Sequence, residues 1–280
     1  MALSVVQTTT PVLTDAGGAT TTLTFASTPT AGNAIVVWYI NAGGANPVLD
    51  PTLADNKGNT PYVKAISANE PGAGQLAGVY YLGKITTTSA TFTVTVTHNA
   101  TTNNFTLITM SEIGTAGLGI TLDKTASNTI TTGTPLVITA AALAQATELI
   151  TSSITVNGSV ANQGIGTAFT AGTQVMVEQN DSLHVAGAGD YKLTTTSENS
   201  ASYAITAAHT DAVGVFASFF ETAAPTPNSK VDGLNSFNRP GRGPFSLGAF
   251  YVADYTAYTT PTVAPVVGGF LNRNYWWDNY

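Results

Sequence analysis

Short apolar runs separated by turn residues recur along the chain. The most apolar run with strand composition covers residues 35–40, Ile-Val-Val-Trp-Tyr-Ile, with Gly-Asn shortly before it and Gly-Gly shortly after it. β-branched and aromatic residues at this density, bounded by turn residues, predict a strand that is covered on both faces. Residues 91–97 instead alternate Thr with Phe92, Val94 and Val96, which is the pattern of a strand with one buried face. We expect residues 35–40 to be the central strand of a sandwich.

Segments of these two kinds predict an all-β, antiparallel β-sandwich. Turns are predicted at residues 55–59, 157–158 and 187–189, where Asn, Asp and Gly cluster. The Ala-rich stretch 139–147 is short and uncapped, so at most one helical turn is expected there. The predicted strands cover residues 4–9, 21–25, 34–41, 62–67, 77–83, 91–97, 105–112, 136–139, 149–156, 174–179, 203–207 and 213–221.

The composition changes at residues 223–228, Ala-Ala-Pro-Thr-Pro-Asn, which is typical of a linker. Residues 1–224 carry 5 Lys, no Arg and 13 acidic residues, whereas residues 225–280 hold every Arg, 11 of the 25 aromatic residues and 6 of the 13 prolines. Prolines at that density prevent a continuous helix or a central strand. We therefore predict a sandwich domain over residues 1–224 and an extended, mostly irregular docking segment over residues 225–280.

Charge and cysteine content narrow the function classes. Charged residues make up 9% of the chain, against about 25% in an average protein, and the abundant Thr suits exposed strand faces. A net charge of −7 disfavours nucleic acid as a partner, and the absence of Cys excludes disulfides and Cys-ligated zinc. The start has no basic and apolar signal-peptide pattern, and no apolar run is long enough to span a membrane. We expect neither a nucleic-acid nor a membrane partner.

Candidate catalytic and metal-binding residues are few. His98, His184 and His209 are far apart in sequence and share no metal-ligand spacing, and no Gly-x-Ser-x-Gly motif is present. The oxygen-rich stretch 55–59 has some ligands of a calcium loop, but Lys57 interrupts the pattern and no later bidentate acid follows. We expect no catalytic residue, no metal and no cofactor. An esterase-type or lyase-type enzyme stays as a third hypothesis, which requires clustered His residues or an acid pair.

Two surfaces are candidates for binding. Tyr62, Tyr80 and Tyr81 are candidate stacking platforms for a glycan, although Tyr80 and Tyr81 must point to opposite faces of one strand. The second surface is the C-terminal segment, since Arg, Tyr and Trp are enriched at binding hot spots. That segment either folds back over its own sandwich or docks on another chain. The predicted partner-binding residues are Arg239, Arg242, Phe245, Phe250, Tyr251, Tyr255, Tyr258, Phe270, Arg273, Tyr275, Trp276 and Trp277.

Several short segments together carry a family resemblance. They are FASTPTAGNAIVVW at 25–38, LADNKGNT at 53–60, VYYLGK at 79–84, FTLITMSEI at 105–113, LD at 122–123, ELI at 148–150 and VFASFF at 215–220. In order and spacing, residues 1–222 resemble a bacterial and phage β-sandwich domain of jelly-roll type, found in phage virion proteins and in secreted bacterial proteins. The resemblance implies a jelly-roll-like fold without known catalysis, with Glu112 and Asp123 capping loops and not forming an acid pair. The stretch FNRPGRGPF at 237–245 resembles tail-end segments of phage structural proteins.

The resemblance and the Arg-rich, aromatic segment together favour a non-enzymatic phage virion structural protein. We expect a capsid decoration or head-fibre type, with a tail or neck component as a variant. Its partners would be capsid proteins or adjacent subunits in a homo-oligomer or high-copy assembly. It would be assembled in the host cytoplasm and be extracellular, within the virion, after lysis. The alternative is a carbohydrate-binding adhesin or receptor-binding module that recognises a host surface glycan.

Overall fold

The computed structural model describes residues 3–14, 19–42, 49–70, 74–98, 105–158, 164–180, 183–196, 198–206 and 208–223. All the regular elements in these residues are β-strands, numbered β1 to β16 along the chain, and they pair antiparallel. Residues 140–147 form bends and no helix. Within the described residues, no helix is long and apolar enough to cross a membrane.

The strands of the described residues form four sheets, here named A to D. Sheet A contains, in spatial order, β1 (Ser4–Thr8), β9 (Phe105–Gly114), β4 (Ala34–Ala42), β7 (Gln75–Leu82) and β6 (Tyr62–Glu70), and β2 (Val12–Thr14) also pairs with β9. Sheet B contains β3 (Thr20–Thr24), β8 (Thr93–Thr97) and β5 (Thr52–Asp55). Sheet C contains β10 (Ile120–Ile130), β16 (His209–Glu221), β12 (Glu148–Gly158), β14 (Val185–Thr194) and β13 (Thr173–Asn180), and sheet D contains β11 (Leu136–Thr139) and β15 (Ser200–Tyr203).

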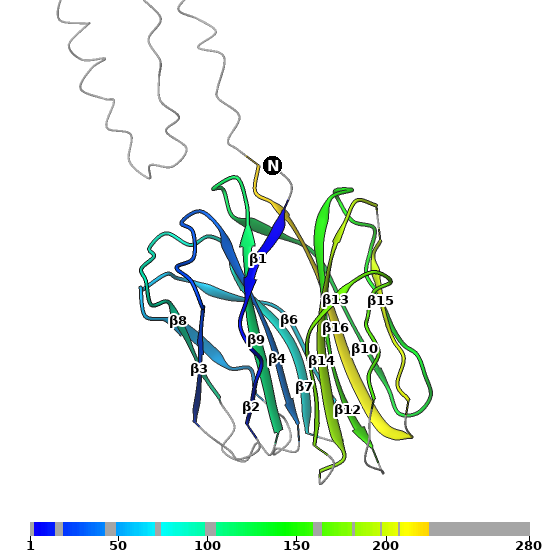
Figure 1. Cartoon of the computed structure of the whole chain (residues 1–280). Coiled ribbons are helices and arrows are strands. Elements are labelled where there is room, and N and C mark those ends of the chain that lie inside the picture. The colour runs from blue at the N-terminus through cyan, green and yellow to red at the C-terminus, as the bar shows by residue number, and fades with distance from the viewer. Residues whose placement is uncertain are drawn as a thin grey trace, which may run out of the picture. The chain divides into compact units, whose positions relative to one another are not determined.

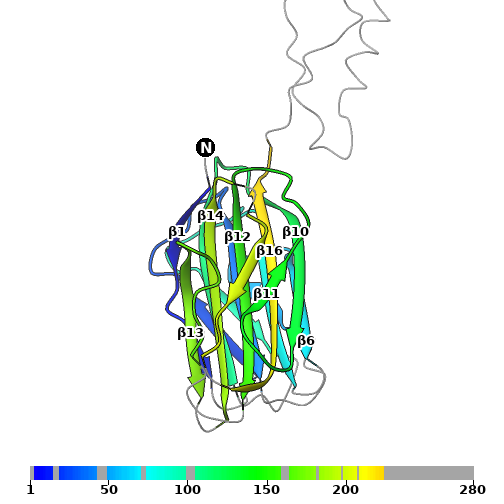
Figure 2. The ribbon, with the colours of Figure 1, turned by 90° about the vertical axis from the view of Figure 1, so that its right-hand side faces the viewer.

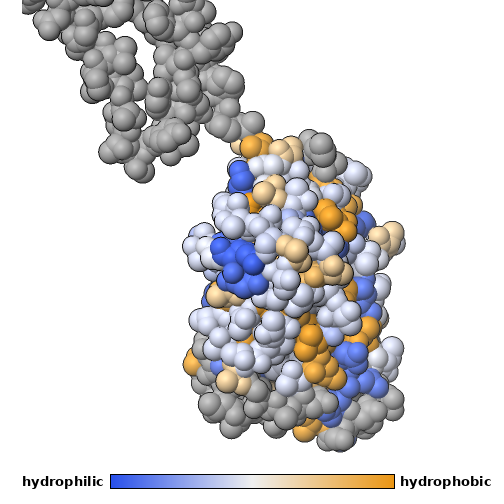
Figure 3. All heavy atoms as spheres, turned by 60° about the vertical axis from the view of Figure 1, so that its left-hand side comes forward, coloured by the Kyte–Doolittle hydropathy of each residue, from blue (hydrophilic) through white to orange (hydrophobic). Residues whose placement is uncertain are grey.

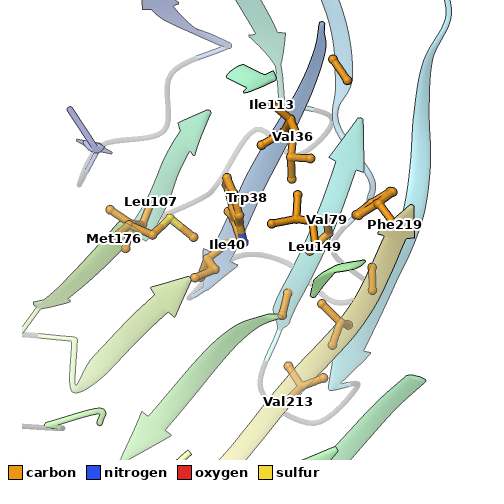
Figure 4. Packing of buried hydrophobic residues seen from close by; sticks show 14 of the residues in the cluster. Val36, Trp38, Ile40, Val79, Leu107, Ile113, Leu149, Met176, Val213 and Phe219 are labelled. Atoms are coloured by element: carbon orange, nitrogen blue, oxygen red, sulfur yellow. The ribbon is translucent and has the colours of Figure 1, made fainter. Parts of the chain in front are cut away.

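Strand β4 has the central place that the sequence predicts. It pairs with β7 on one side and β9 on the other, and all nine of its residues are fully buried. Because successive side chains in a strand point to opposite faces, Trp38 faces sheet C and Tyr39 faces sheet B. Figure 4 shows Val36, Trp38 and Ile40 of β4 in the cluster that joins sheets A and C.

The four sheets are stacked in the order B, A, C, D. Apolar clusters fill each interface, for example Leu23 and Val94 of sheet B against Val37 of sheet A, and Ile138 and Tyr203 of sheet D with residues of sheet C. The two large sheets face each other in Figure 1, and Figure 2 shows β11 lying over the outer face of sheet C. The predicted all-β, antiparallel β-sandwich is therefore confirmed, with a partial extra layer on each side.

The turn predicted at residues 187–189 is wrong, because Gly187 and Gly189 lie inside β14. A Cβ atom on Gly189 would lie 3.0 Å from Trp38 Cδ1 and 2.8 Å from Met176 Cε. A Cβ atom on Gly187 would lie 2.9 Å from Ile40 Cδ1. These glycines therefore allow the backbone of sheet C to approach the large side chains of sheet A, and they do not mark a change of direction.

Four strands lack a clear sequence signal and were not predicted: β2, β5, β10 and β14. Strand β10 is a polar edge strand, and β14 is rich in Gly and Ala, so neither shows an apolar run. The strand predicted at 203–207 instead covers Ser200–Tyr203. The residues predicted as a turn at 157–158 are the last two of β12. The turn at residues 55–59 is confirmed, with Gly58 at φ 75°.

The long edge strands of the two large sheets are irregular. They are β1 and β6 in sheet A, and β10 and β13 in sheet C, whereas the three-residue edge strand β2 pairs with β9 in regular register. Register shifts of this kind interrupt the regular ladder and disfavour the addition of a strand from another chain at the edge. The register shifts lie between Val5 and Gln7, Lys64 and Ile66, Leu122 and Thr125, and Gln174 and Met176.

Candidate functional site

The partner-binding residues predicted from the sequence lie outside the described residues. They are Arg239, Arg242, Phe245, Phe250, Tyr251, Tyr255, Tyr258, Phe270, Arg273, Tyr275, Trp276 and Trp277, all beyond Ala223. The docking role of residues 225–280, and the division of the chain after residue 224, stay predictions.

The three tyrosines considered for glycan stacking are used inside the fold. Tyr80 is 2% exposed, and its hydroxyl donates to Asp50 Oδ1 (2.7 Å). The Tyr62 hydroxyl donates to Asp55 Oδ2 (3.0 Å). Tyr81 points to the other face and packs on Phe219, with ring centroids 5.1 Å apart. Burial, followed by the neighbouring carboxylates, raises the pKa of Tyr62 and of Tyr80. These three rings do not form a shared stacking platform.

His98 is a satisfied structural histidine. Asn41 Nδ2 donates to the Tyr39 hydroxyl (3.3 Å), and the same hydroxyl bonds His98 Nδ1 (3.1 Å). His98 Nε2 bonds Thr21 Oγ1 (2.8 Å). Burial lowers the pKa of His98, which favours the neutral ring. Both ring nitrogens are thus held by side chains of β3 and β4.

The other two histidines lie in the second half of the sandwich. His209 begins β16 and pairs with Gly158, and the Gly158 amide donates to the backbone oxygen of His184 (2.8 Å). His98 follows β8 of sheet B, so the three do not form one cluster. The part of the chain that the structure describes holds no group of three His, Cys, Asp or Glu residues able to bind a metal.

Asp55 stabilises the turn at residues 55–59, the oxygen-rich stretch that has some ligands of a calcium loop. Its Oδ1 accepts from the backbone amides of Lys57 (2.8 Å) and Asn59 (3.1 Å), and its Oδ2 accepts from Tyr62. Asn59 Oδ1 accepts from the amide of Thr86 (2.8 Å). The Asp55 carboxylate satisfies backbone amides of the turn, which is the common role of Asp in turns, and Asn59 connects the turn to Thr86.

Glu112 caps a loop, as the resemblance implies. The residue is 1% exposed, and its two carboxyl oxygens accept from three donors. Oε1 accepts from Asn33 Nδ2 (2.6 Å) and from the Thr30 amide (2.8 Å), and Oε2 accepts from Gln7 Nε2 (2.7 Å). Charge-assisted bonds of this kind make burial of a carboxylate tolerable. These hydrogen bonds also connect β1 and the loop before β4 to the C-terminal end of β9.

Asp123 also caps a loop, as the resemblance implies, and it forms an acid pair with Glu148 of β12. Its Oδ2 accepts from the Ala144 amide (2.6 Å) and its Oδ1 from Lys124 Nζ (2.6 Å). The Gln145 amide donates to Glu148 Oε1 (3.0 Å), so two consecutive loop amides are held by two neighbouring carboxyl groups. The sequence did not reveal Glu148 as the partner, because β16 lies between β10 and β12 and brings the two acids together.

The pKa values of Asp123 and Glu148 are shifted in opposite directions. Burial, and then the charge of Asp123 next to it, raises the pKa of Glu148. Burial acts in the same sense on Asp123, but the Ala144 amide and the Lys124 ammonium outweigh it and hold its pKa below the ordinary value. The pair therefore works as an ionised Asp123 beside a Glu148 that protonates more readily. The amides and Lys124 occupy the Asp123 oxygens, so the arrangement fits a structural clasp.

The outer face of sheet B carries rows of threonine. Seven of the eight outward positions in the described strands β3, β8 and β5 are Thr, and the eighth is Ala54. Figure 3 shows that the side of the molecule carrying β3 and β8 is mostly of intermediate hydropathy. The predicted Thr-rich surface is thus present. The cross-strand rows are Thr20, Thr97 and Thr52; Thr22, Thr95 and Ala54; and Thr24 with Thr93.

A shallow groove of about 220 Å³ lies beside β13 and is lined by Gly164, Ile165, Val177, Glu178 and Gln179. Ligand pockets of enzymes and receptors usually enclose about 300–1,000 Å³. The groove also lacks the converging polar groups of such pockets, because Glu178 is its one charged residue. It is therefore a weak candidate for a small-molecule site.

Comparisons with known proteins found no match among protein-family models, curated proteins or solved structures. The resemblance to the bacterial and phage domain consequently rests on the sequence motifs. The all-β fold agrees with that resemblance but does not identify a function, since one fold hosts many functions.

Proposed function

We propose that this chain is a non-enzymatic structural protein of a phage virion, of the capsid decoration or head-fibre type. The sandwich forms a stable exposed body, and residues 225–280 attach it to the capsid or to neighbouring subunits. The chain assembles in the host cytoplasm as a high-copy component and becomes extracellular with the virion after lysis.

The observation that supports this proposal most is the contrast between the sandwich and the segment that follows it. In the sandwich, the candidate polar groups are committed to internal contacts: Glu112, Asp55 and His98 hold loops and strands. The bulged edges of sheets A and C disfavour strand addition. The C-terminal 56 residues contain all three Arg and 11 of the 25 aromatic residues of the chain. These residue types dominate binding hot spots.

Truncation tests the attachment role. Removing residues 228–280 is expected to leave a folded sandwich, with a β-type circular dichroism spectrum and a cooperative melt, that is no longer incorporated into particles. The paired substitution Arg239→Ala with Arg242→Ala should lower incorporation, and Lys84→Ala, at an exposed position of the sandwich, serves as the control for loss of one positive charge.

The readout is mass spectrometry of purified particles, with cross-linking to identify the neighbouring protein. Full occupancy by the truncated chain would overturn the attachment role of residues 225–280. Absence of the intact chain from purified particles would overturn the virion assignment itself.

A further inference from the structure

A carboxyl group is buried in the second half of the sandwich at Asp190 of β14, a residue with no exposed surface. Ala188 belongs to the cluster between sheets C and D, so Asp190, two residues further along the strand, points toward the same layer. Its neighbours within the sheet are Ser152 of β12 and Gln174 of β13. No donor in the described residues completes a hydrogen bond to either carboxyl oxygen.

The groups around Asp190 supply no positive charge. The Tyr203 hydroxyl of β15, the Ala168 amide and the Gln174 side chain lie close enough to favour the ionised form, and no Lys, Arg or His is among the described groups that act on it. Ser152 Oγ already donates to the Val215 carbonyl (2.7 Å). Burial outweighs these contacts and raises the pKa of Asp190 to about 7.

The backbone of Asp190 is held more firmly than its side chain. Trp38 Nε1, from sheet A, donates to the Asp190 backbone oxygen (3.3 Å). Strand β14 lies between β12 and β13 in sheet C. The residue therefore has little freedom to carry its carboxyl group to the surface by itself, and water reaches the group when the layer above it moves.

That layer is thin. Strands β11 and β15 have four residues each, and residues 164–168 extend the layer through a few backbone bonds. The Ser202 amide donates to the Ala168 carbonyl (2.9 Å) and the Gly166 amide to the Ala204 carbonyl (2.9 Å). By contrast, β12 pairs with two neighbours along its whole length. Units with few bonds open locally at a lower free energy than central strands do.

We propose that sheet D and residues 164–168 form a proton-dependent cover over sheet C, with Asp190 as its sensor. The cover stays closed while the Asp190 carboxyl is protonated. Once the carboxyl group has lost its proton, the cover opens more often, because opening hydrates a carboxylate whose burial the neighbouring donors do not compensate.

The pH dependence follows from the two states of Asp190. In the open state the carboxyl group has its ordinary pKa of 3.8, and in the closed state its pKa is about 7. The closed state therefore binds more protons between these values, and the opening equilibrium rises about tenfold per pH unit in this window before levelling off.

Amide hydrogen exchange of the full chain at pH 5 and pH 8 tests the proposal. The reporter amides are Gly166, Ser202 and Thr206, whose hydrogen bonds each involve a residue of the cover. After correction for the intrinsic exchange rate, their protection factors should fall about 80-fold between the two pH values. Amides of β4 should keep their protection. Asp190→Asn should abolish the fall, and Glu178→Gln, at an exposed acid of the adjacent strand β13, should retain it.

Equal protection of the reporter amides at both pH values in the wild-type chain would overturn the proposal, as would an unchanged fall in Asp190→Asn. If that variant does not fold, a carbon NMR titration of the Asp190 carboxyl in the wild-type chain decides the question. A midpoint near 7 supports the proposal, and a midpoint below 5 overturns it.

Discussion

Replacing Gly189 with Ala adds one methyl group where sheets A and C approach each other closely. The added carbon would lie 2.8 Å from Met176 Cε, 3.0 Å from Met176 Cγ and 3.0 Å from Trp38 Cδ1. Favourable carbon–carbon contacts lie at about 3.5–4.0 Å. Met176 has a flexible side chain, but Trp38 is fully buried and its ring nitrogen is bonded to the Asp190 backbone. The indole ring therefore has little room to move.

The size of the effect follows from two opposing terms. Overpacking of a core costs about 1–3 kcal/mol, and the smaller conformational freedom of Ala in the unfolded chain offsets about 0.4–1 kcal/mol. We expect the free energy of unfolding of Gly189→Ala to be about 1–2 kcal/mol lower than that of the wild type. For a sandwich of this size, that corresponds to a fall in Tm of about 2–8 °C.

Urea unfolding followed by circular dichroism measures this difference. The matched control is Gly166→Ala, where the new carbon would lie 3.5 Å from Ala204 Cβ, an ordinary contact. The control should leave the free energy of unfolding unchanged or slightly higher. If Gly189→Ala is as stable as the control, the close approach of the sheets at this glycine does not constrain the core, and the explanation given for β14 fails.

Three further predictions concern buried polar groups. Burial and the Asp50 carboxylate raise the pKa of Tyr80, so Tyr80 should stay protonated in the folded chain at pH 11. The ultraviolet tyrosinate signal at pH 11 should therefore be the same in Tyr80→Phe as in the wild type, and a smaller signal in the variant would contradict this. Glu112→Gln should lower the free energy of unfolding, measured with urea, by about 1–3 kcal/mol. The substitution replaces one of the two carboxyl oxygens, which together accept from three donors, with an NH₂ group that cannot accept. An unchanged free energy of unfolding would refute the capping role. The pKa of Glu148 is raised in the folded chain, so the folded state binds the proton more tightly than the unfolded state does. The wild-type chain therefore loses stability as the pH rises from the ordinary Glu pKa to the raised pKa. Glu148→Gln should therefore gain stability relative to wild type between pH 5 and pH 8, and a relative loss would contradict the acid-pair assignment.

The central strand could be predicted because its signal is local. Residues 35–40 form an apolar run that is buried whichever sheets cover it, so β4 followed from composition alone. The same reasoning failed for β14, since Gly187 and Gly189 resemble turn residues until the side chains opposite them are known. It failed for β10 because a polar edge strand has no apolar run, and its partner β16 follows far later in the chain.

The candidate sites also differ in whether their contacts are local in sequence. The Asp55 turn was predictable from five consecutive residues, because its hydrogen bonds connect near neighbours. The partnership of Asp123 with Glu148 depends on the strand order β10, β16, β12, and the isolation of Asp190 depends on which layer covers β14. Neither property is encoded in a short window of sequence.

The irregular edges of sheets A and C affect how closely copies of this protein can be packed together. At high concentration, a flat β-edge pairs with any similar edge nearby, which leads to aggregates of native molecules. Shifted registers in β1, β6, β10 and β13 interrupt the regular hydrogen-bond ladder that such pairing requires. Many copies of this sandwich can therefore stand close together and remain separate folded bodies, with contact between them left to side chains.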